Sequence, residues 1–363
     1  MRTPRVLFVG RTRYRLPLNE SLSRKWDALS DQLDLRVLAA GTGDDPRFHL
    51  VSPKPLDGPL FYATLPVRVA RELRSFHPDV VMCESPYEAA AVEVGRALVR
   101  SQAKVIVEIH GDWHTSTRLY GSRARALLGP VGDRIADTAV RRADAQRAVS
   151  AFTASLVRGV GREPTDVFTA YTDLSAFTAP AVPVPAEPRA LFVGVLERYK
   201  NIEGLAAAWR LVAERLPDAQ LQLVGSGRDS EIARGLVGER VRWDERLEPA
   251  QVAQALDDAR VFLLASESEG LPRVVVEAFL RGRPVVATRA GGTPEIVVDD
   301  VTGLLVDRGD VAGFADAAVR ALSEPGLAER LGAAGRESVD RFLTTPGDFA
   351  NRMRALIDEV IAL

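Results

Sequence analysis

Short apolar runs alternate with longer amphipathic segments along most of the chain. Residues 5–9, 104–109 and 261–265 are runs of the length and composition expected of buried strands. Between such runs, segments such as 86–100 and 202–215 repeat their apolar positions at helical spacing. Because strand and helix alternate, the pattern predicts parallel sheets covered by helices, the doubly wound α/β class.

The same pattern predicts the remaining elements. Further strands are expected at residues 35–38, 79–83, 147–149 and 166–170, and two more begin near residues 190 and 221. Helices are expected at 18–33, 66–76, 123–142, 311–322, 326–342 and 346–363. Residues 10–15 are expected to form a loop, because Gly10 and three arginines follow the first apolar run.

A proline-rich segment marks the expected domain boundary. Prolines 180, 183, 185 and 188 give a stiff stretch with few N–H groups to offer a sheet. A chain of 363 residues suits two domains. We therefore expect an N-terminal domain over 1–177, a linker over 178–188 and a C-terminal domain over 189–345.

Composition narrows the class of protein. Hydrophobic residues make up 46% and charged residues 26%, with no leader and no apolar run of membrane-spanning length, so a soluble cytoplasmic protein is expected. The single cysteine, Cys83, excludes an internal disulfide and a cysteine-built metal site. Residues 1–175 hold 25 basic against 20 acidic residues, which makes this half the more suited to an anionic partner or membrane surface.

The segment 266–280 carries two carboxylates through a strand-to-helix junction. Gly270 and its neighbours open the helix, where unpaired peptide N–H groups suit an anion. Glu269 lies in the turn and Glu277 about two helical turns further on, so each can accept hydrogen bonds from a different diol of a sugar nucleotide. Ordinary roles, as a helix-end charge and an exposed helix glutamate, remain open for this pair.

Other polar residues also follow predicted strands. Arg11, Arg13 and Arg15 come after the first strand, where they either contact phosphate or an anionic acceptor or are simply solvated. His110-Gly111-Asp112 follows the strand at 104–109. The glycine turn at Gly225 is a weak dinucleotide signal, because Ser230 replaces the third glycine.

The motif EGLPRVVVEA at 269–278, followed by RGRPVVAT, GGTPEI and TGLLV, resembles the retaining glycosyltransferases of family 4. The resemblance implies a GT-B architecture, in which two Rossmann-like doubly wound domains face a central cleft. It implies that the first domain binds the acceptor and the second the nucleotide sugar, and that the last helix, 346–363, packs back on the first domain.

The resemblance also implies roles for individual residues. Catalytic roles fall to His110, Glu269 and Lys200. Donor binding falls to Gly10, Arg198, Lys200, Gly225, Glu269, Gly270, Leu271 and Glu277. Val195 stands where the family usually has an arginine, so Arg198 is the substitute to test. Arg11, Arg13 and Arg15 are the acceptor-binding candidates.

The expected function is transfer of a sugar from a nucleoside diphosphate sugar to a hydroxyl acceptor with retention, as in a hexosyltransferase. The leaving diphosphate assists on the front face, and no metal or other cofactor is expected. The acceptor is a glycan, a glycolipid or a small-molecule glycoside, and an anionic or lipid-linked acceptor stays open. A sugar-nucleotide epimerase of the same architecture is the alternative, and a NAD-dependent oxidoreductase is disfavoured.

The expected partners are small molecules and a membrane surface. The arginine-rich segment 118–147 suits peripheral contact at the inner membrane face through the N-terminal domain, with a solvated helix as the other reading. No nucleic-acid partner is expected.

Overall fold

The computed structural model describes residues 2–52, 57–115 and 129–363. The chain divides into two compact units. Unit 1 comprises residues 1–172 together with 344–363, and unit 2 comprises 173–343. The C-terminal segment therefore belongs to the same unit as the start of the chain.

Unit 1 is built on a seven-stranded parallel sheet with the order β3-β2-β1-β4-β5-β6-β7. The strands are β1 (Arg5–Arg15), β2 (Asp34–Thr42), β3 (Phe48–Val51), β4 (Val80–Cys83), β5 (Lys104–Ile109), β6 (Ala145–Ala148) and β7 (Asp166–Val167). The strand order reverses beside β1, and such a switch point opens a crevice at the carboxyl ends of the strands.

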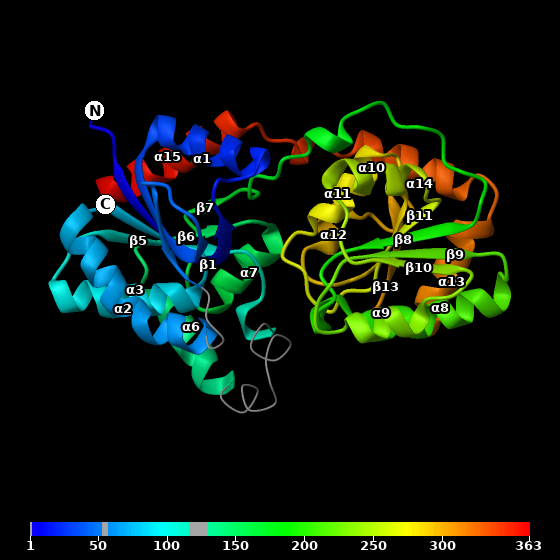
Figure 1. Ribbon diagram of the computed structural model, residues 1–363, viewed down its shortest axis with the longest axis horizontal. Helices are drawn as coiled ribbons and strands as arrows, with labels where there is room; N and C mark the ends of the chain where they lie inside the picture. Colours follow the sequence, from blue (N-terminus) through cyan, green and yellow to red (C-terminus); the bar gives the residue numbers. More distant parts are fainter. Residues whose placement is uncertain (1, 53–56, 116–128) are drawn as a thin grey trace. The chain divides into compact units, whose positions relative to one another are not determined.

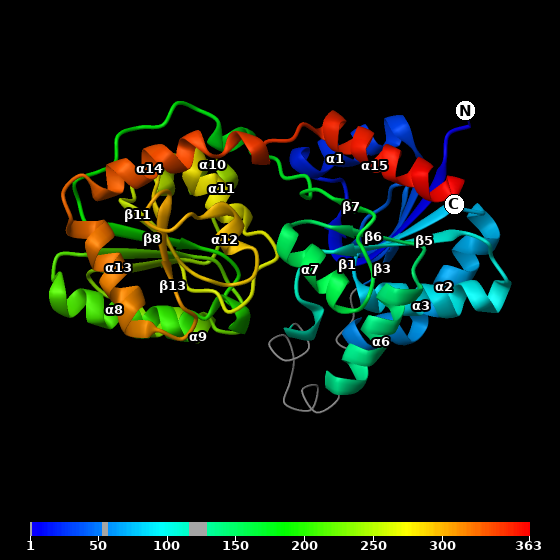
Figure 2. The ribbon, with the colours of Figure 1, turned by 180° about the vertical axis from the view of Figure 1, so that it is seen from behind.

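Helices cover both faces of this sheet (Figures 1 and 2). Their bounds are α1 (Glu20–Gln32), α2 (Asp57–Phe76), α3 (Pro86–Val99), α6 (Gly129–Arg142), α7 (Ala151–Gly159) and α15 (Pro346–Ala362). Leu7 and Val9 of β1 pack with α2, α3 and α6, whereas Val6 and Phe8 pack with α1 and α15. The alternation follows from the two-residue period of a strand.

β1 corrects one expectation of the sequence. The strand continues through Gly10–Arg15, which the glycine and arginines had indicated as a loop. Its pairing with β2 shifts register between Val9 and Arg13 and then resumes to Arg15. The register shift accommodates the extra residues of β1. The polar segment therefore stays paired with β2 at the carboxyl end of the strand.

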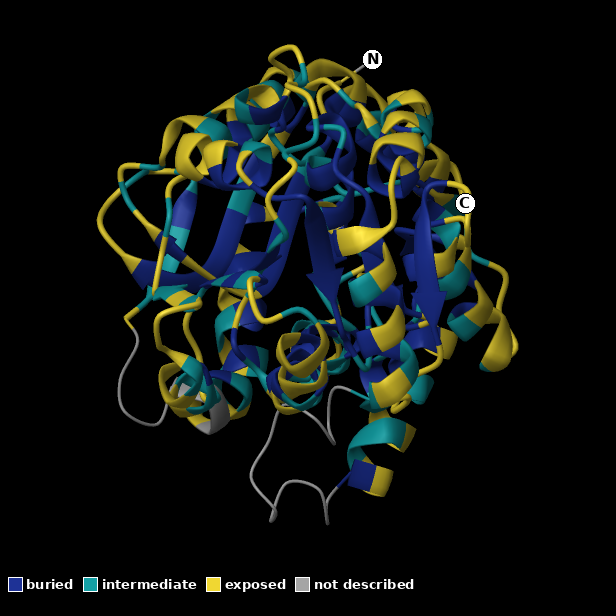
Figure 3. Cartoon of the chain, turned by 90° about the vertical axis from the view of Figure 1, so that its right-hand side faces the viewer, coloured by how far each residue is buried: buried dark blue, intermediate teal, exposed yellow. Residues whose placement is uncertain are grey.

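Unit 2 contains a six-stranded parallel sheet with the order β10-β9-β8-β11-β12-β13. The strands are β8 (Arg189–Val193), β9 (Gln220–Val224), β10 (Val241–Asp244), β11 (Val261–Leu264), β12 (Val285–Thr288) and β13 (Gly303–Val306). Most residues of these strands are buried, and strands in Figure 3 are largely coloured as buried. Strands buried on both faces are continuous apolar runs, which is why the sequence revealed several of them.

The helices of unit 2 also form two layers. They are η1 (Ser175–Phe177), η2 (Arg198–Lys200), α8 (Ile202–Arg215), α9 (Ser230–Leu236), α10 (Pro249–Asp257), α11 (Arg273–Leu280), α12 (Thr293–Ile296), α13 (Val311–Ser323), α14 (Leu327–Glu337) and η3 (Asp340–Phe342). One hydrophobic core joins α8, α9 and α13 to the sheet, and another joins α10 and α11 to its opposite face. The helix expected over 326–342 ends early, and a 3-10 turn follows it.

The proline-rich segment lies within unit 2, held by buried arginines. Arg281 donates to the carbonyl of Ala179 at 2.7 Å and forms an ion pair with Asp257 at 2.6 Å. Arg283 donates to the carbonyl of Val182 at 3.0 Å, and Arg260 to that of Pro185 at 2.8 Å. A segment poor in N–H groups still has carbonyls to satisfy, and these guanidinium groups satisfy them.

Among the described residues, no helix combines the length and the apolar character that crossing a membrane requires. Residues 116–128, which include part of the arginine-rich segment and of the helix expected over 123–142, lie outside the described residues.

Candidate functional site

The junction between β11 and α11 presents the first turn of a helix at the carboxyl end of a strand. Pro272 is the N-cap, and no side chain caps the helix. The first-turn N–H groups of such a helix carry partial positive charge. Gly270 and Leu271 lie in the turn just before this end, where a phosphate oxygen would be well placed.

Lys200 and Glu269 form a buried ion pair at this turn. Lys200 Nζ lies 2.7 Å from Glu269 Oε1, and the Ser266 hydroxyl donates to the same oxygen at 2.6 Å. Both charged side chains are 9% exposed. Both protein donors converge on Oε1, while Oε2 accepts no hydrogen bond from any described residue. Glu269 thus keeps one oxygen for a hydroxyl group, and Lys200 keeps two N–H groups.

Glu277 is a half-buried carboxylate on α11 with no hydrogen-bond partner among the described residues. Burial raises its pKa above the ordinary value of 4.5, and the nearby charges of Arg273 and Lys200 only partly oppose the rise. A carboxylate that has lost water without gaining donors is costly in the empty protein. Two hydroxyl donors from a ligand would relieve that cost.

Two glycines let neighbouring turns approach closely. Gly291 has φ +53°, and a Cβ there would lie 1.8 Å from the carbonyl oxygen of Glu269. Gly225 has φ +136°, and a Cβ there would lie 1.8 Å from the carbonyl oxygen of Gly194. Only glycine fits both the conformation and the space. These contacts hold the turn after β9 against the turn after β8, and the turn after β12 against the turn after β11.

A second network braces the Lys200 turn. Asn201 caps α8 in the left-handed region, φ 52°, and its amide donates to the Glu267 carboxylate at 3.0 Å. Arg308 donates to the carbonyl of Glu267 at 3.1 Å. Arg198 is exposed on the same turn, which leaves its side chain accessible to a ligand. The sequence had assigned no role to Ser266, Glu267 or Arg308, because their contacts join segments far apart along the chain.

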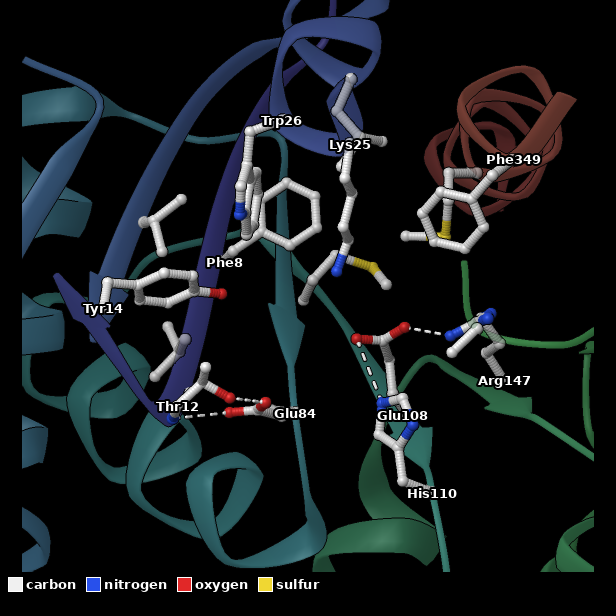
Figure 4. A pocket seen from close by; sticks show the side chains of 17 residues that line it. Phe8, Thr12, Tyr14, Lys25, Trp26, Glu84, Glu108, His110, Arg147 and Phe349 are labelled. Atoms are coloured by element: carbon white, nitrogen blue, oxygen red, sulfur yellow. Dashed lines mark hydrogen bonds and ion pairs between the residues drawn. The ribbon is translucent and has the colours of Figure 1, made fainter. Parts of the chain in front are cut away.

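His110, predicted as catalytic, belongs to unit 1 and is exposed at the end of β5. Its Nε2 lies 3.8 Å from Glu108 Oε2 (Figure 4). Glu108 in turn pairs with Arg147, whose side chain is fully buried and also donates to the carbonyls of Phe168 and Thr169. Burial alone would raise the pKa of Glu108, but Arg147 and His110 outweigh it and lower the pKa to about 2.

Gly10 and the three arginines also belong to unit 1. Gly10 is buried at the end of the first apolar run, and a Cβ there would meet Glu84 Oε2 at 2.1 Å. Arg11 lines a pocket with Arg68, together with the apolar residues Ala40, Leu50, Val51, Leu60 and Phe61. Arg13 and Arg15 are exposed and do not line this pocket. The structure thus separates Arg11 from the other two.

In the described ranges, no three histidine, cysteine, aspartate or glutamate side chains are grouped as a metal ion would require. At this turn, positive charge that could balance an anion comes from Lys200, the exposed Arg198 and the start of α11.

Solved structures identify the fold. Sucrose-phosphate synthase from Thermosynechococcus elongatus superposes with a TM-score of 0.77 at 22% identity, covering 99% of both chains. Anabaena HepE in complex with UDP-glucose gives 0.71 at 16% identity, with the same coverage. Two parallel α/β sheets matching these enzymes define the GT-B fold.

Family comparisons identify the class. A model of "Glycosyltransferase Family 4" matches residues 21–172, and one of "Glycosyl transferases group 1" matches residues 187–324. The chain belongs to glycosyltransferase family 4.

Curated relatives include sulfoquinovosyl transferase SQD2 of Arabidopsis thaliana, 33% identical over 162 residues, which are 44% of this chain and 31% of the relative. Alpha-maltose-1-phosphate synthase of Mycobacterium tuberculosis is 36% identical over 173 residues, 42% of this chain and 43% of the relative. LpsE of Rhizobium meliloti, a lipopolysaccharide core biosynthesis glycosyltransferase, is 27% identical over 285 residues, 76% of this chain and 74% of the relative. The first two of these relatives are thus matched over less than half of their own length.

Proposed function

We propose that this protein transfers a sugar from a nucleoside diphosphate sugar to a hydroxyl acceptor with retention of configuration. The observation that carries the proposal is the cluster at the start of α11, where the Lys200–Glu269 pair lies beside the unpartnered Glu277. A cation, a helix end and two carboxylates match the diphosphate and the two diol-bearing rings of such a donor.

Each residue has a role in this proposal. Glu277 accepts hydrogen bonds from the ribose diol, and Glu269 uses Oε2 to accept from a hydroxyl of the transferred sugar. Lys200 contacts the diphosphate with the N–H groups that Glu269 does not use, and Arg198 adds a second cation. Gly225, Gly270 and Leu271 border the donor, and His110 contacts the transferred sugar. Gly10, within β1, is the donor-binding candidate of unit 1.

The reaction breaks the bond between the anomeric carbon and the diphosphate oxygen. The acceptor oxygen bonds to the same face of that carbon, and its proton passes to the leaving diphosphate oxygen. Lys200 and the start of α11 stabilise the negative charge that develops on the diphosphate, which is electrostatic catalysis. The buried position of Lys200 strengthens this effect by limiting water.

The acceptor supplies the attacking hydroxyl. The family's members use varied acceptors, and one relative is a mannosyltransferase named for a phosphatidylinositol mannoside. The arginines of unit 1 favour an anionic or lipid-linked acceptor. In that case the protein contacts the inner membrane face peripherally.

A thermal-shift screen against nucleotide sugars tests the proposal, with UDP-glucose and GDP-mannose first. Ligand at 100 times its Kd should add about 2.7 kcal/mol to the free energy of unfolding. Product from the best donor is then examined by NMR for its anomeric configuration. An inverted product would contradict the proposal, and an epimerised sugar formed without any acceptor would favour the epimerase.

A further inference from the structure

Unit 1 contains a pocket between its sheet and the helices α1 and α15. Gly10, Thr12 and Tyr14 of β1 line it, together with Trp26 of α1, Glu84 after β4 and Phe349 of α15 (Figure 4). Its volume is about 90 Å³, and one water molecule needs roughly 10–15 Å³. The pocket therefore has room for several hydroxyl-sized groups.

Trp26 contributes a hydrogen-bond donor that the described residues leave unsatisfied. Its indole Nε1 is buried and interacts with the Tyr14 hydroxyl, but it has no hydrogen bond of normal geometry to any described residue, and the side chain as a whole is 3% exposed. The ring is fixed by edge contacts with Phe8 and Phe48, at 5.2 and 5.4 Å between centroids. A buried N–H without an acceptor is uncommon in folded proteins, and its presence on the pocket wall points to a bound oxygen.

Glu84 contributes an acceptor that lacks a cation. Its carboxylate receives the Thr12 N–H at 3.1 Å and the Thr12 hydroxyl, and no described basic side chain pairs with it. Each carboxylate oxygen can accept more than one hydrogen bond, so capacity remains for ligand hydroxyls. Thr12 fixes the orientation of the carboxylate at the pocket.

The charges around the pocket alternate in sign. Glu84 and Glu108 bring negative charge, and Arg147 and Lys25 bring positive charge; the Lys25 ammonium lies 5.1 Å from the Trp26 ring centre. Burial raises the pKa of Tyr14, so its hydroxyl remains a donor at neutral pH. Because these charges balance, a charged ligand would gain no net attraction to offset the loss of its hydration. An uncharged compound with many hydroxyl groups satisfies both kinds of neighbour.

We propose that this pocket binds an uncharged, hydroxyl-rich ring, a sugar or cyclitol, as the accepting unit of the acceptor. This rests on the proposed function above. Trp26 Nε1 donates to one ring oxygen, and Glu84 accepts from ring hydroxyls beside it. Any anionic or lipid portion of the acceptor lies outside the pocket, and Arg11 on the other face of β1 does not contribute to it.

Calorimetric or saturation-transfer NMR titration of the full chain tests the proposal. The neutral probes are glucose, mannose and myo-inositol, and the charged ones are glucose 6-phosphate, glucuronate and glucosamine. We expect a neutral probe to bind, with charged analogues at least about tenfold weaker, because a charged group loses its hydration without a net opposite charge in the pocket. Tighter binding of a charged probe, or no binding of any neutral one, overturns the proposal.

Two substitutions place the binding in this pocket. Trp26→Phe should weaken the neutral probe roughly 3- to 10-fold, the effect of one neutral hydrogen bond, and Glu84→Gln by roughly tenfold or more. Glu93→Gln, a half-buried glutamate of α3 outside the pocket, is the matched control and should change nothing. If the melting temperature of either pocket variant falls below that of the parent, Tyr14→Phe is titrated in its place. Equal affinity in parent and pocket variants overturns the assignment.

UDP and UDP-glucose are titrated into the same samples to separate this proposal from the proposed function. Nucleotide binding without polyol binding removes the pocket assignment alone. Polyol binding without binding of any nucleotide or nucleotide sugar contradicts the proposed function, and with it the role of the ring as acceptor.

Discussion

Lys200 Nζ lies 2.7 Å from Glu269 Oε1, so a cation and a carboxylate that the sequence assigns to different parts of the donor contact each other. The pairing keeps the buried ammonium compensated while the site is empty. It also couples the two residues: removing either one changes the charge that the other presents to a ligand.

The first prediction separates the two carboxylates. Glu277→Gln should weaken nucleoside diphosphate and nucleotide sugar alike, by about 1–3 kcal/mol, because both ligands contain the ribose. Glu269→Gln should weaken only the nucleotide sugar or its turnover. It should leave the nucleoside diphosphate bound as well or more tightly, because Lys200 then has no carboxylate partner.

Calorimetric titration of UDP and UDP-glucose into both variants measures these effects. Each variant must keep the parent's melting temperature. If Glu269→Gln weakens UDP as much as Glu277→Gln does, the assignment of one carboxylate to each ring is wrong.

The second prediction concerns pH. Because burial raises the pKa of Glu277, this carboxyl takes up a proton at higher pH than an ordinary glutamate. Its protonated form accepts from a diol more weakly, so UDP affinity should fall as pH is lowered from about 8 toward about 5. Glu277→Gln should remove this component and leave only the titration of the diphosphate. Identical pH profiles for parent and variant would exclude a contact between Glu277 and the ribose.

The third prediction concerns Glu108 and its buried partner Arg147. Glu108→Gln leaves the guanidinium uncompensated and should lower the free energy of unfolding by about 3–5 kcal/mol. The folded pKa of about 2 lies below the ordinary 4.5. The parent therefore holds this stabilisation above about pH 4.5 and loses it as the pH falls toward 2.

Chemical denaturation at several pH values measures both effects. The difference in stability between parent and Glu108→Gln should shrink across that acidic window. A constant difference would show that the ionised state of Glu108 is not the source of the stabilisation.

The fourth prediction concerns the arginines of β1. Arg11 and Arg68 border an apolar pocket and have no carboxylate partner among the described residues. Arg11→Gln and Arg68→Gln should each weaken binding of dodecyl phosphate by about 1.5–3 kcal/mol, since each removes a charge-assisted contact. Arg15→Gln, exposed on the same strand and outside the pocket, should not.

Titration of dodecyl phosphate and of UDP into the three variants is the measurement. A loss of UDP affinity equal to the loss for the amphiphile would assign Arg11 to the donor phosphates instead.

The fifth prediction concerns metal ions. Lys200 and the start of α11 supply positive charge where the diphosphate is proposed to bind, so transfer should proceed in the presence of a strong chelator. Turnover with and without EDTA is the measurement. Activity lost in EDTA and restored by Mg²⁺ or Mn²⁺ would contradict it.

The sequence by itself determined the class of fold and the element that opens the proposed donor site. Buried parallel strands are continuous apolar runs, so β5 and β11 could be recognised without tertiary information. The segment around Glu269 and Glu277 was equally visible, because its chemistry lies within one strand-to-helix junction. α8 was predicted with the bounds that it has, because its apolar positions repeat at helical spacing within one segment.

Only the tertiary structure decided which distant residues meet. Gly10–Arg15 had the local composition of a loop, but pairing with β2 made it strand. Lys200 and Glu269 lie 69 positions apart, and no local pattern indicates that they pair. The pocket of unit 1 joins Trp26 of α1 to Phe349 of α15, near opposite ends of the chain. Side-chain contacts of this kind depend on how the layers pack, which periodicity along a single segment does not encode.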